Sequence, residues 1–189
     1  MATLVLEDES GSHRMDLTLN AGRRYRAVLG RPALKAQLMR RLGDLAPIGV
    51  VAGDGGLIGN LKVWENLVLP VTYLGATPLE ELEARAESLF REFGILRARF
   101  AELCAALPDR LSAFERRLAA FVRAMLVEPE IMLYDRLFDG LTRAEAENAA
   151  RFDRVFQLHF PFRTALFVDS ESSAPAGFAP GATWLLRSL

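Results

Sequence analysis

Residues 107–142 read LPDRLSAFERRLAAFVRAMLVEPEIMLYDRLFDGLT, and the interpretation of the whole chain depends on this stretch. Ser112 followed three residues later by Glu115 forms a capping box, which predicts the start of a helix. Apolar residues then recur at helical spacing and predict one buried face, made of Phe114, Leu118, Phe121, Val122, Met125 and Leu126. We expect the more solvated side of this helix to carry Arg116, Arg117 and Arg123.

A short apolar strand follows this helix. Pro129 disfavours helical geometry in the residue before it, so the sequence Glu-Pro-Glu at 128–130 ends the helix. Residues 131–134, Ile-Met-Leu-Tyr, are too few for a helix and predict a central strand of a parallel sheet. Asp135 then stands at the carboxyl end of that strand.

In its order and spacing this stretch resembles the signature motif, helix and Walker B strand of an ABC-type ATPase. The family pattern is LSGGQ, a helix that ends in an ARAL-like run, then Glu-Pro, a hydrophobic strand and Asp-Glu. Here the matching segments read LSAFE, VRAML, VEPE and IMLY, and they are followed by Asp135 and Arg136. The resemblance implies an α/β fold of the P-loop NTPase type, with an ABC ATPase-like core and a helical subdomain.

Gly30 follows a predicted strand at 25–29 and precedes a predicted helix at 34–45, which is the setting of a phosphate-binding loop. In the motif G-x-x-x-x-G-K-[ST] the lysine comes one residue later than Lys35 does after Gly30. A nucleotide site would retain Gly30, Arg31, Lys35 and Asp135, whereas Ala36 replaces the hydroxyl that reaches Mg²⁺. The alternative is that Lys35 is a solvated lysine in the first helical turn.

The signature and switch positions of the family are replaced in this chain. Ser112 is retained, but Ala113 and Phe114 replace two glycines of the signature, and Glu115 replaces its glutamine. Gly53 stands in place of the Q-loop glutamine, and Arg136 stands in place of the carboxylate after the Walker B aspartate. Ser170 stands in place of the switch histidine. The resemblance therefore implies a pseudo-ATPase with no catalytic residues, no metal site and no required cofactor, and Mg²⁺-ATP stays open as the alternative. We expect Arg136 to form a salt bridge with Asp135.

Residues 48–73, IGVVAGDGGLIGNLKVWENLVLPVTY, resemble the Q-loop and following segment of Mla-type phospholipid-trafficking ABC ATPases. In the family this segment forms the groove that receives a coupling helix of the membrane permease. The resemblance implies a partner groove made of Leu57, Asn60, Trp64, Glu65, Asn66 and Pro70. The alternative, that these residues only cap and pack a helix, stays open.

The composition limits the class of protein. A chain of 189 residues with 51% hydrophobic and 25% charged residues can bury a core and is not typical of disordered proteins. A net charge of −1 gives no electrostatic reason to expect nucleic-acid binding. The single Cys104 fits a reducing compartment, no apolar run is long enough to cross a bilayer, and the first residues lack a basic leader. We therefore expect a cytoplasmic protein.

We expect one ABC ATPase-like domain over residues 1–189, with its core at 1–70 and 127–189 and a helical subdomain at about 71–126. Residues 44–47 lead directly from the first helix into the next strand, so we expect the antiparallel β subdomain of the family to be trimmed. Predicted helices at 77–93, 96–106 and 142–158 and a strand at 162–168 complete the expected elements.

Three functions are compatible with this sequence. The first is a non-catalytic ABC-type subunit that docks on a transporter permease in lipid or envelope transport, as a homodimer or with another ATPase subunit. The second is a weak ATP-binding or ATP-hydrolysing subunit that uses Lys35 and Asp135. The third is a free-standing homodimeric interaction module that dimerises through an apolar surface of Phe114 and Phe138, with Leu137 beside it.

Overall fold

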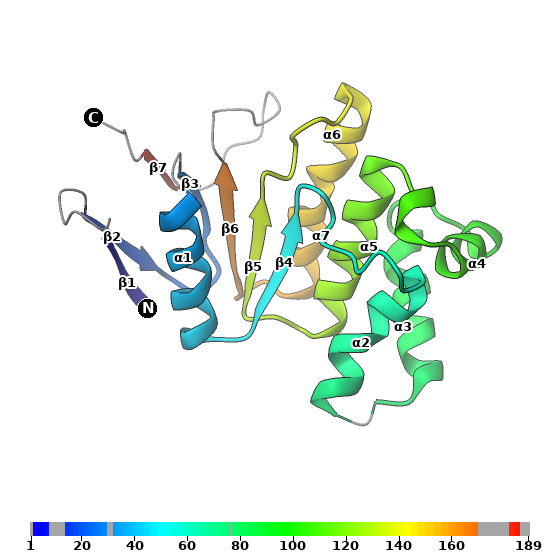
Figure 1. The fold of residues 1–189 in the computed structure, drawn as a ribbon. Helices are drawn as coiled ribbons and strands as arrows, with labels where there is room; N and C mark the ends of the chain where they lie inside the picture. Colours follow the sequence, from blue (N-terminus) through cyan, green and yellow to red (C-terminus); the bar gives the residue numbers. More distant parts are fainter. Residues whose placement is uncertain (1, 8–13, 30–31, 76, 170–181, 186–189) are drawn as a thin grey trace.

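The computed structural model describes residues 2–7, 14–29, 32–75, 77–169 and 182–185 (Figure 1). Its main sheet is five-stranded and parallel, in the order β4-β5-β6-β3-β7, and an antiparallel pair β1-β2 lies beside it. The strands of the main sheet are β3 (Arg24–Val28), β4 (Ile48–Ala52), β5 (Ile131–Asp135), β6 (Thr164–Asp169) and β7 (Ala182–Leu185). The expected α/β fold with a central parallel strand before Asp135 is confirmed.

The alternating residues of β5 explain how helices cover both faces of the sheet. Ile131 and Leu133 pack in one apolar cluster with Leu34, Leu38 and Leu42 of α1 (Pro32–Leu45). Met132 and Tyr134 belong to a second cluster, which contains the buried residues of α5 (Ala113–Leu126) and α7 (Arg151–His159). Because both faces are covered, β5 and β6 are buried along their whole length, as continuous apolar runs predict.

The antiparallel part of the fold is small. β1 (Ala2–Glu7) and β2 (Arg14–Leu19) pair with each other, and α1 packs against β1. Only Ala46 and Pro47 separate α1 from β4, so no strand lies between them. The expectation of a trimmed antiparallel β subdomain is therefore confirmed at this point of the chain.

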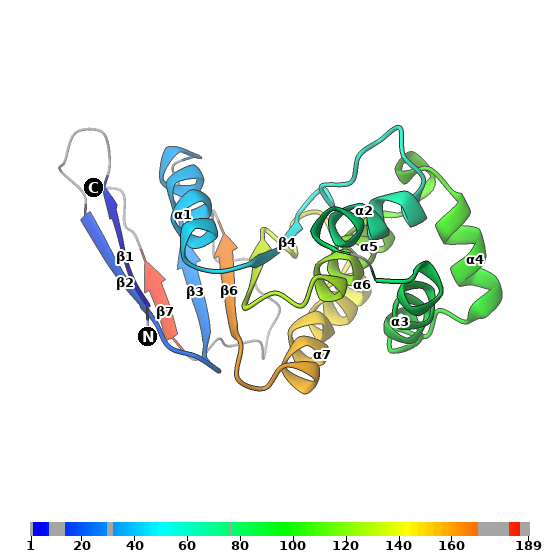
Figure 2. The same ribbon diagram turned by 90° about the horizontal axis from the view of Figure 1, so that it is seen from below.

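Helix α5 lies between the sheet and a group of helices that cover its other side (Figures 1 and 2). It packs on β4, and it also packs on α2 (Val63–Leu74) and α3 (Leu79–Arg91). Helix α4 (Arg97–Ala105) packs on α2 and α3, and a 3-10 turn at Pro108–Arg110 leads into α5. The chain returns to the sheet through β5 and then through α6 (Arg143–Ala149) and α7.

The structure confirms the start and the apolar face of α5 but corrects its polar side. The backbone N–H of Glu115 donates to Ser112 Oγ at 3.1 Å, and the N–H of Ser112 donates to Glu115 Oε2 at 2.9 Å. Arg117, expected on the solvated side, is only 3% exposed and donates to the carbonyl of Asp139. Since α5 is covered by both the sheet and other helices, no side of it is fully solvated; Arg123 is half-buried and donates to the carbonyl of Gly56 at 2.8 Å.

The prediction of an exposed apolar surface after β5 is wrong. Leu137 and Phe138 are 1% and 6% exposed, and the Phe138 ring stacks on Phe167 of β6 with a centroid distance of 6.4 Å. Phe114 is half-buried and stacks on Phe152 of α7 at 5.9 Å. Both rings are used inside this chain, which removes the Phe114/Phe138 surface as a dimer contact.

Three element boundaries also differ from prediction. The helix expected at 142–158 is divided at Ala150 into α6 and α7, and Thr142 is the N-cap of α6. Helix α3 begins at Leu79 instead of at residue 77, with Pro78 as its N-cap, and β6 begins at Thr164 instead of at residue 162. In the described part of the chain, no helix has the length and apolarity needed to cross a membrane.

Asp153 of α7 supplies a testable consequence of this packing. It is 1% exposed, Arg24 Nη1 lies 3.3 Å from its Oδ2, and burial raises the pKa of its carboxyl even though Arg24 opposes the shift. A folded-state pKa above the unfolded value adds stability at pH below the unfolded value, and this is lost as pH rises through the folded value. Asp153→Asn keeps a neutral group of the same size at this position.

We predict that the free energy of unfolding of Asp153→Asn, relative to that of the unmodified chain, rises as pH increases between about 4 and 8. Urea unfolding at several pH values measures this difference. Asp109→Asn, at a side chain that is 68% exposed, is the matched control and should show a smaller change with pH. A difference that does not vary with pH would contradict the assignment that burial of this carboxylate outweighs its pairing with Arg24.

Candidate functional site

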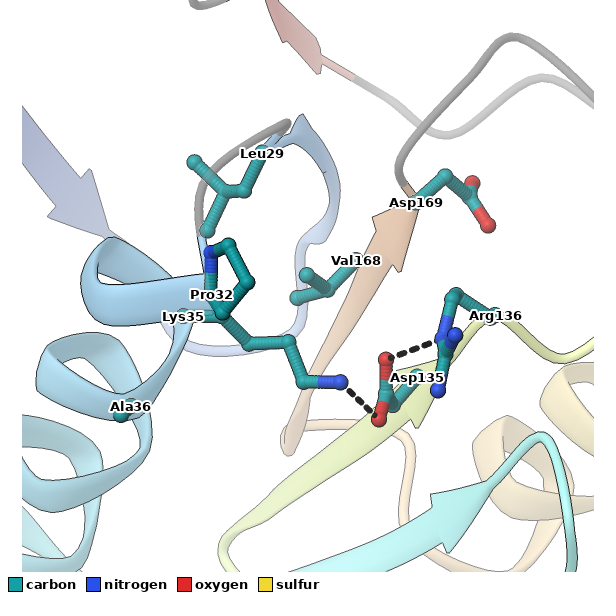
Figure 3. A pocket seen from close by; sticks show the side chains of 8 residues that line it. All are labelled: Leu29, Pro32, Lys35, Ala36, Asp135, Arg136, Val168 and Asp169. Carbon is teal, nitrogen blue, oxygen red and sulfur yellow. Dashed lines mark ion pairs between the residues drawn. The ribbon is translucent and has the colours of Figure 1, made fainter.

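A pocket of about 340 Å³ lies at the carboxyl ends of β3, β5 and β6, beside the first turns of α1 (Figure 3). Open parallel sheets place their ligand sites at this edge. The pocket is lined by Leu29, Pro32, Lys35, Ala36, Asp135, Arg136, Val168 and Asp169. The structure thus brings together four residues of the predicted nucleotide and switch positions, namely Lys35, Ala36, Asp135 and Arg136.

The charged groups of this pocket are paired with one another. Lys35 Nζ lies 2.6 Å from Asp135 Oδ2, so Lys35 turns toward β5 and is not a freely solvated lysine. Arg136 Nε lies 3.6 Å from Asp135 Oδ1, which confirms the expected salt bridge. The Asp135 side chain is 10% exposed and is held between these two cations.

The backbone of Arg136 is unusual. Its φ of 49° lies in the left-handed region, which few residues other than glycine adopt, and its N–H donates to the carbonyl of Val168 at 2.8 Å. Gly53, at the end of β4, lies against the same peptide: a Cβ on Gly53 would stand 2.8 Å from the Arg136 carbonyl oxygen. Gly53 is therefore the residue that this close approach of two chain segments requires. Gly30, Arg31 and Ser170 lie outside the described residues.

Sequence reasoning missed Arg26, which holds the second aspartate of the pocket. Arg26 Nε donates to Asp169 Oδ2 at 2.9 Å, and both side chains are buried. Burial raises the pKa of Asp169, the charge of Arg26 opposes this, and the carboxylates of Asp139 and Asp135 add to the increase. The available signal was a charged residue within the strand sequence RYRAV, but it gave no partner.

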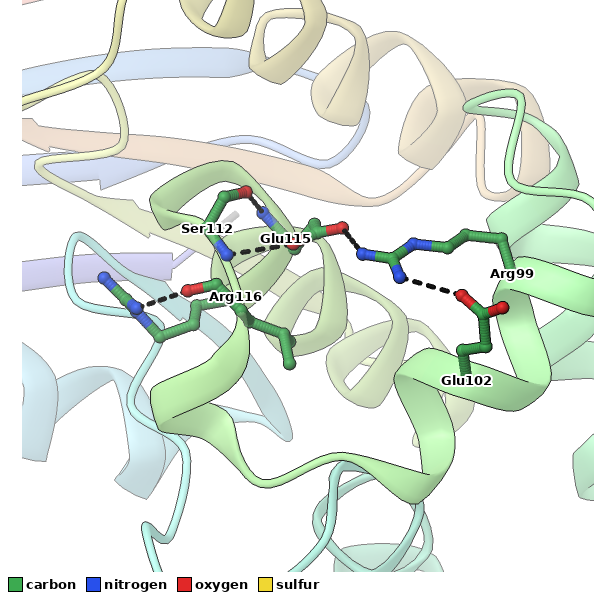
Figure 4. A network of polar contacts seen from close by, with 6 residues as sticks. Arg99, Glu102, Ser112, Glu115 and Arg116 are labelled. Atoms are coloured by element: carbon green, nitrogen blue, oxygen red, sulfur yellow. Dashed lines mark hydrogen bonds and ion pairs between the residues drawn. The ribbon is translucent and has the colours of Figure 1, made fainter.

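The signature-like residues lie away from this pocket and serve the helices. Glu115 accepts from Arg99 Nη2 at 2.6 Å, and Arg99 Nη1 also donates to Glu102 at 2.9 Å (Figure 4). Partial burial would raise the pKa of Glu115, but the Ser112 amide and the Arg99 guanidinium hold it below its usual value. Arg116 Nη1 donates to the Leu111 carbonyl at 2.7 Å. Ser112 and Glu115 thus form the capping box of α5, and Ala113, directly after Ser112, is the first residue of the helix.

Two residues of the predicted partner groove have clear structural roles. Asn66 is 1% exposed: its Oδ1 accepts from the Ile58 N–H at 2.7 Å, and its Nδ2 lies 3.1 Å from three carbonyl oxygens, those of Ile58, Leu61 and Lys62. Glu65 Oε2 accepts from the backbone N–H of Lys62 at 2.6 Å. These contacts cap α2 and fix the loop before it. For Glu65 and Asn66, the alternative of capping and packing therefore describes what the structure shows.

Trp64 lines a second pocket of about 300 Å³, which lies where α4 packs on α2. The other lining residues are Lys62, Glu83, Arg97, Phe100, Ala101, Cys104 and Ala105. Burial raises the pKa of the Cys104 thiol to about 12, so this thiol is an apolar wall and not a nucleophile. Of the remaining groove residues, Leu57 and Pro70 are half-buried and Asn60 is exposed.

The described residues contain no group of three or more His, Cys, Asp or Glu side chains that could hold a metal ion. The first pocket therefore offers a lysine, an arginine and two ion-paired aspartates. It presents charge to a ligand, but every carboxylate in its lining already has a cationic partner.

Comparison with known proteins identifies a group of similar ATP-binding proteins, although no protein-family model matches the chain. The chain is 31% identical over 162 residues to an aliphatic sulfonates import ATP-binding protein, SsuB 3, of Nocardia farcinica, covering 78% of this chain and 60% of that protein. It is 30% identical over 133 residues to the lipoprotein-releasing system ATP-binding protein LolD of Maricaulis maris, covering 67% and 56%. The chain thus spans less than two thirds of the length of these relatives.

Solved structures show the same fold. MJ0796, a bacterial ABC transporter cassette determined as a dimer, matches with a TM-score of 0.68 and 18% identity, over 88% of this chain and 85% of that one. The cbiO1 protein of Clostridium perfringens, part of the ABC transporter complex cbiONQ, matches with a TM-score of 0.66 and 14% identity, over 88% and 78%. The fold is that of these ABC transporter cassettes. In sequence, the chain is similar to the two ATP-binding proteins named above.

Proposed function

We propose that this protein is a non-catalytic ABC ATPase-like subunit that docks on a transporter permease at the cytoplasmic face of a membrane. The observation that carries the proposal is the arrangement at the end of β5, where Arg136 replaces a carboxylate and pairs with Asp135. Phosphoryl transfer to water needs a group that positions or polarises the attacking water. An arginine is permanently protonated and cannot accept that proton.

The neighbouring positions give the same picture. Ala36 brings a methyl group, not a hydroxyl, to the pocket, and Asp169 is occupied by Arg26 at 2.9 Å. A glutamine side chain at position 53 would have to start from a Cβ only 2.8 Å from the Arg136 carbonyl oxygen. These residues support the proposal that positions used for catalysis in the family make structural contacts within this chain.

The docking part of the proposal is supported by the surface around α2 and α4. The Trp64 pocket combines apolar side chains with the charged residues Glu83 and Arg97, which pair with each other at 2.9 Å. Lys62 lies at its edge, and no ion pair of the Lys62 side chain occurs among the described residues. A partner helix could insert one apolar side chain there and present a carboxylate to Lys62. We propose that residues 71–126 form the helical subdomain and that 1–70 and 127–189 form the core. The pocket then takes Lys62 and Trp64 from the core and its other lining residues from the helical subdomain.

The class of cargo we propose is lipid or another envelope component. It rests on the Mla-like sequence of residues 48–70 and on the similarity to two lipoprotein-releasing ATP-binding proteins. Pairing with a second copy or with another ATPase subunit would follow the dimeric arrangement described for MJ0796. The second candidate function, a weak ATPase, is favoured by one observation: Lys35 and Asp135 converge in one pocket beside the start of α1.

A phosphate-release assay with Mg²⁺-ATP separates these two functions. We expect no release above that of the buffer, because the pocket lacks a free general base among its lining residues. Lys35→Ala serves as the comparison variant. Turnover that is present in the unmodified chain and lost in Lys35→Ala would establish the weak ATPase instead.

Docking is tested by co-purification with an Mla-type permease expressed together with the chain. We expect a stable complex that Trp64→Ala weakens at least about tenfold, as loss of a central aromatic anchor does. Phe162→Ala is the matched control, because this ring is 82% exposed but lies between α7 and β6, outside the Trp64 pocket. Failure to associate with any permease, or equal weakening by both variants, would exclude this surface.

Gly53→Ala tests whether the backbone at Gly53 packs tightly against the backbone of Arg136. The added Cβ would lie 2.8 Å from a backbone oxygen, so we expect a loss of about 1–3 kcal/mol in the free energy of unfolding. Gly59→Ala is the control, since a Cβ there would meet no atom within 4 Å. Equal stability of the two variants in urea would show that this contact is not tight.

A further inference from the structure

Each carboxylate oxygen of Asp135 faces a different cation of the same chain (Figure 3). Lys35 reaches Oδ2 from α1 at 2.6 Å, and Arg136 reaches Oδ1 from the residue after β5 at 3.6 Å. One negative charge is therefore flanked by two positive charges from separate segments. The group Lys35-Asp135-Arg136 carries a net positive charge.

Burial makes this pairing stronger on the side of Lys35. The side chains of Asp135 and Lys35 are 10% and 30% exposed, so solvent screens their attraction only in part. Arg136 is 50% exposed, so its contribution is more strongly screened. A carboxylate as buried as Asp135 needs a partner, and removal of Lys35 alone would leave that need largely unmet.

A divalent cation does not fit this set of residues. The ABC relatives are ATP-binding proteins, and Mg²⁺ accompanies the phosphates in nucleotide sites of this kind. Mg²⁺ requires oxygen ligands in near-octahedral geometry, but Ala36 has no side-chain oxygen and Asp169 is held by Arg26. A dication at Asp135 would have to displace Lys35 from its 2.6 Å contact and would still lie close to Arg136, which repels it.

We propose that Lys35 and Arg136 are built-in counterions that take the place of a divalent cation at Asp135, so that this pocket works without metal. The inference rests on the proposed non-catalytic function and extends it, since it gives Lys35 and Arg136 a positive role. They join the start of α1 to the end of β5 in the way that a bound ion would. The pocket is thereby preformed in any concentration of Mg²⁺.

Binding of Mn²⁺, followed by the loss of the free-ion signal in electron paramagnetic resonance, tests this inference. The test variant is the double substitution Lys35→Met and Arg136→Glu, which removes both cations and adds a carboxylate beside Asp135. We expect no measurable binding by the unmodified chain and at least about tenfold tighter binding by the variant. Glutamate at position 136 faces the same backbone conformation as arginine does, so the substitution adds no new Cβ.

The matched control is the double substitution Arg110→Met and Arg143→Glu, which removes two exposed cations outside both pockets and shifts the net charge equally. Arg143 is 92% exposed on α6. Circular dichroism and thermal unfolding establish that each variant is folded. If the double variant of the pocket does not fold, Arg136→Glu alone replaces it, and we expect a smaller but measurable gain.

Three outcomes would overturn the inference. They are Mn²⁺ binding by the unmodified chain as tight as that of the variant, no gain of binding in the folded variant, and an equal gain in the control. The proposed function fails on a different result, namely ATP hydrolysis. A chain that binds Mn²⁺ but does not hydrolyse ATP would refute the counterion role and leave the non-catalytic function standing.

Discussion

The structure depends on the packing of α5 between the parallel sheet and the helices α2 and α3. The ring of Phe121 in α5 stacks on that of Phe152 in α7 with a centroid distance of 4.7 Å. It also meets the ring of Phe93, after α3, at a centroid distance of 5.8 Å, so one apolar cluster continues from the sheet to the helical layer. A helix that is covered on so many sides has no surface left for solvated charges. This is why Arg117 is buried at 3% exposure and Arg123 is tied to the loop before α2.

The same packing fixes the pocket. Helix α5 ends at Leu126, and Glu128 turns the chain with a φ of 51°. The interior strand β5 then runs between β4 and β6 to Asp135. Because β5 is buried on both faces, its terminal carboxylate is largely removed from water and must be paired. Lys35 and Arg136 form ion pairs with it from within the chain, although its Oδ1 accepts no hydrogen bond, and Arg26 pairs with Asp169. Charges that are satisfied internally stabilise the fold but are less available to a ligand.

The features that could be predicted from sequence are those with local causes. The capping box of Ser112 and Glu115, the apolar period of α5 and the short strand before Asp135 each depend on neighbouring residues, and all three are present. The errors come from distant contacts. Nothing near Arg117 or Phe138 in the sequence indicates that Asp139 and Phe167 will bury them, and no local signal pairs Arg26 with Asp169, which is 143 residues away. Gly53 belongs to this class too, because its neighbour is the backbone of Arg136.

The loop before α2 shows why folding and docking need not be alternatives. Asn66 and Glu65 hold this loop from the first turn of α2, and Arg123 of α5 holds it at Gly56. Gly55, with a φ of 91°, lets the loop pass so close to α5 that a Cβ would stand 2.8 Å from that of Arg116. The loop is therefore held in place where it meets α2, and Trp64, the second residue of that helix, is presented by this scaffold. A substitution at Asn66, which is buried, would disturb both the fold and any docking. A substitution at Trp64, which is half-exposed at a pocket, would change docking with less effect on the fold.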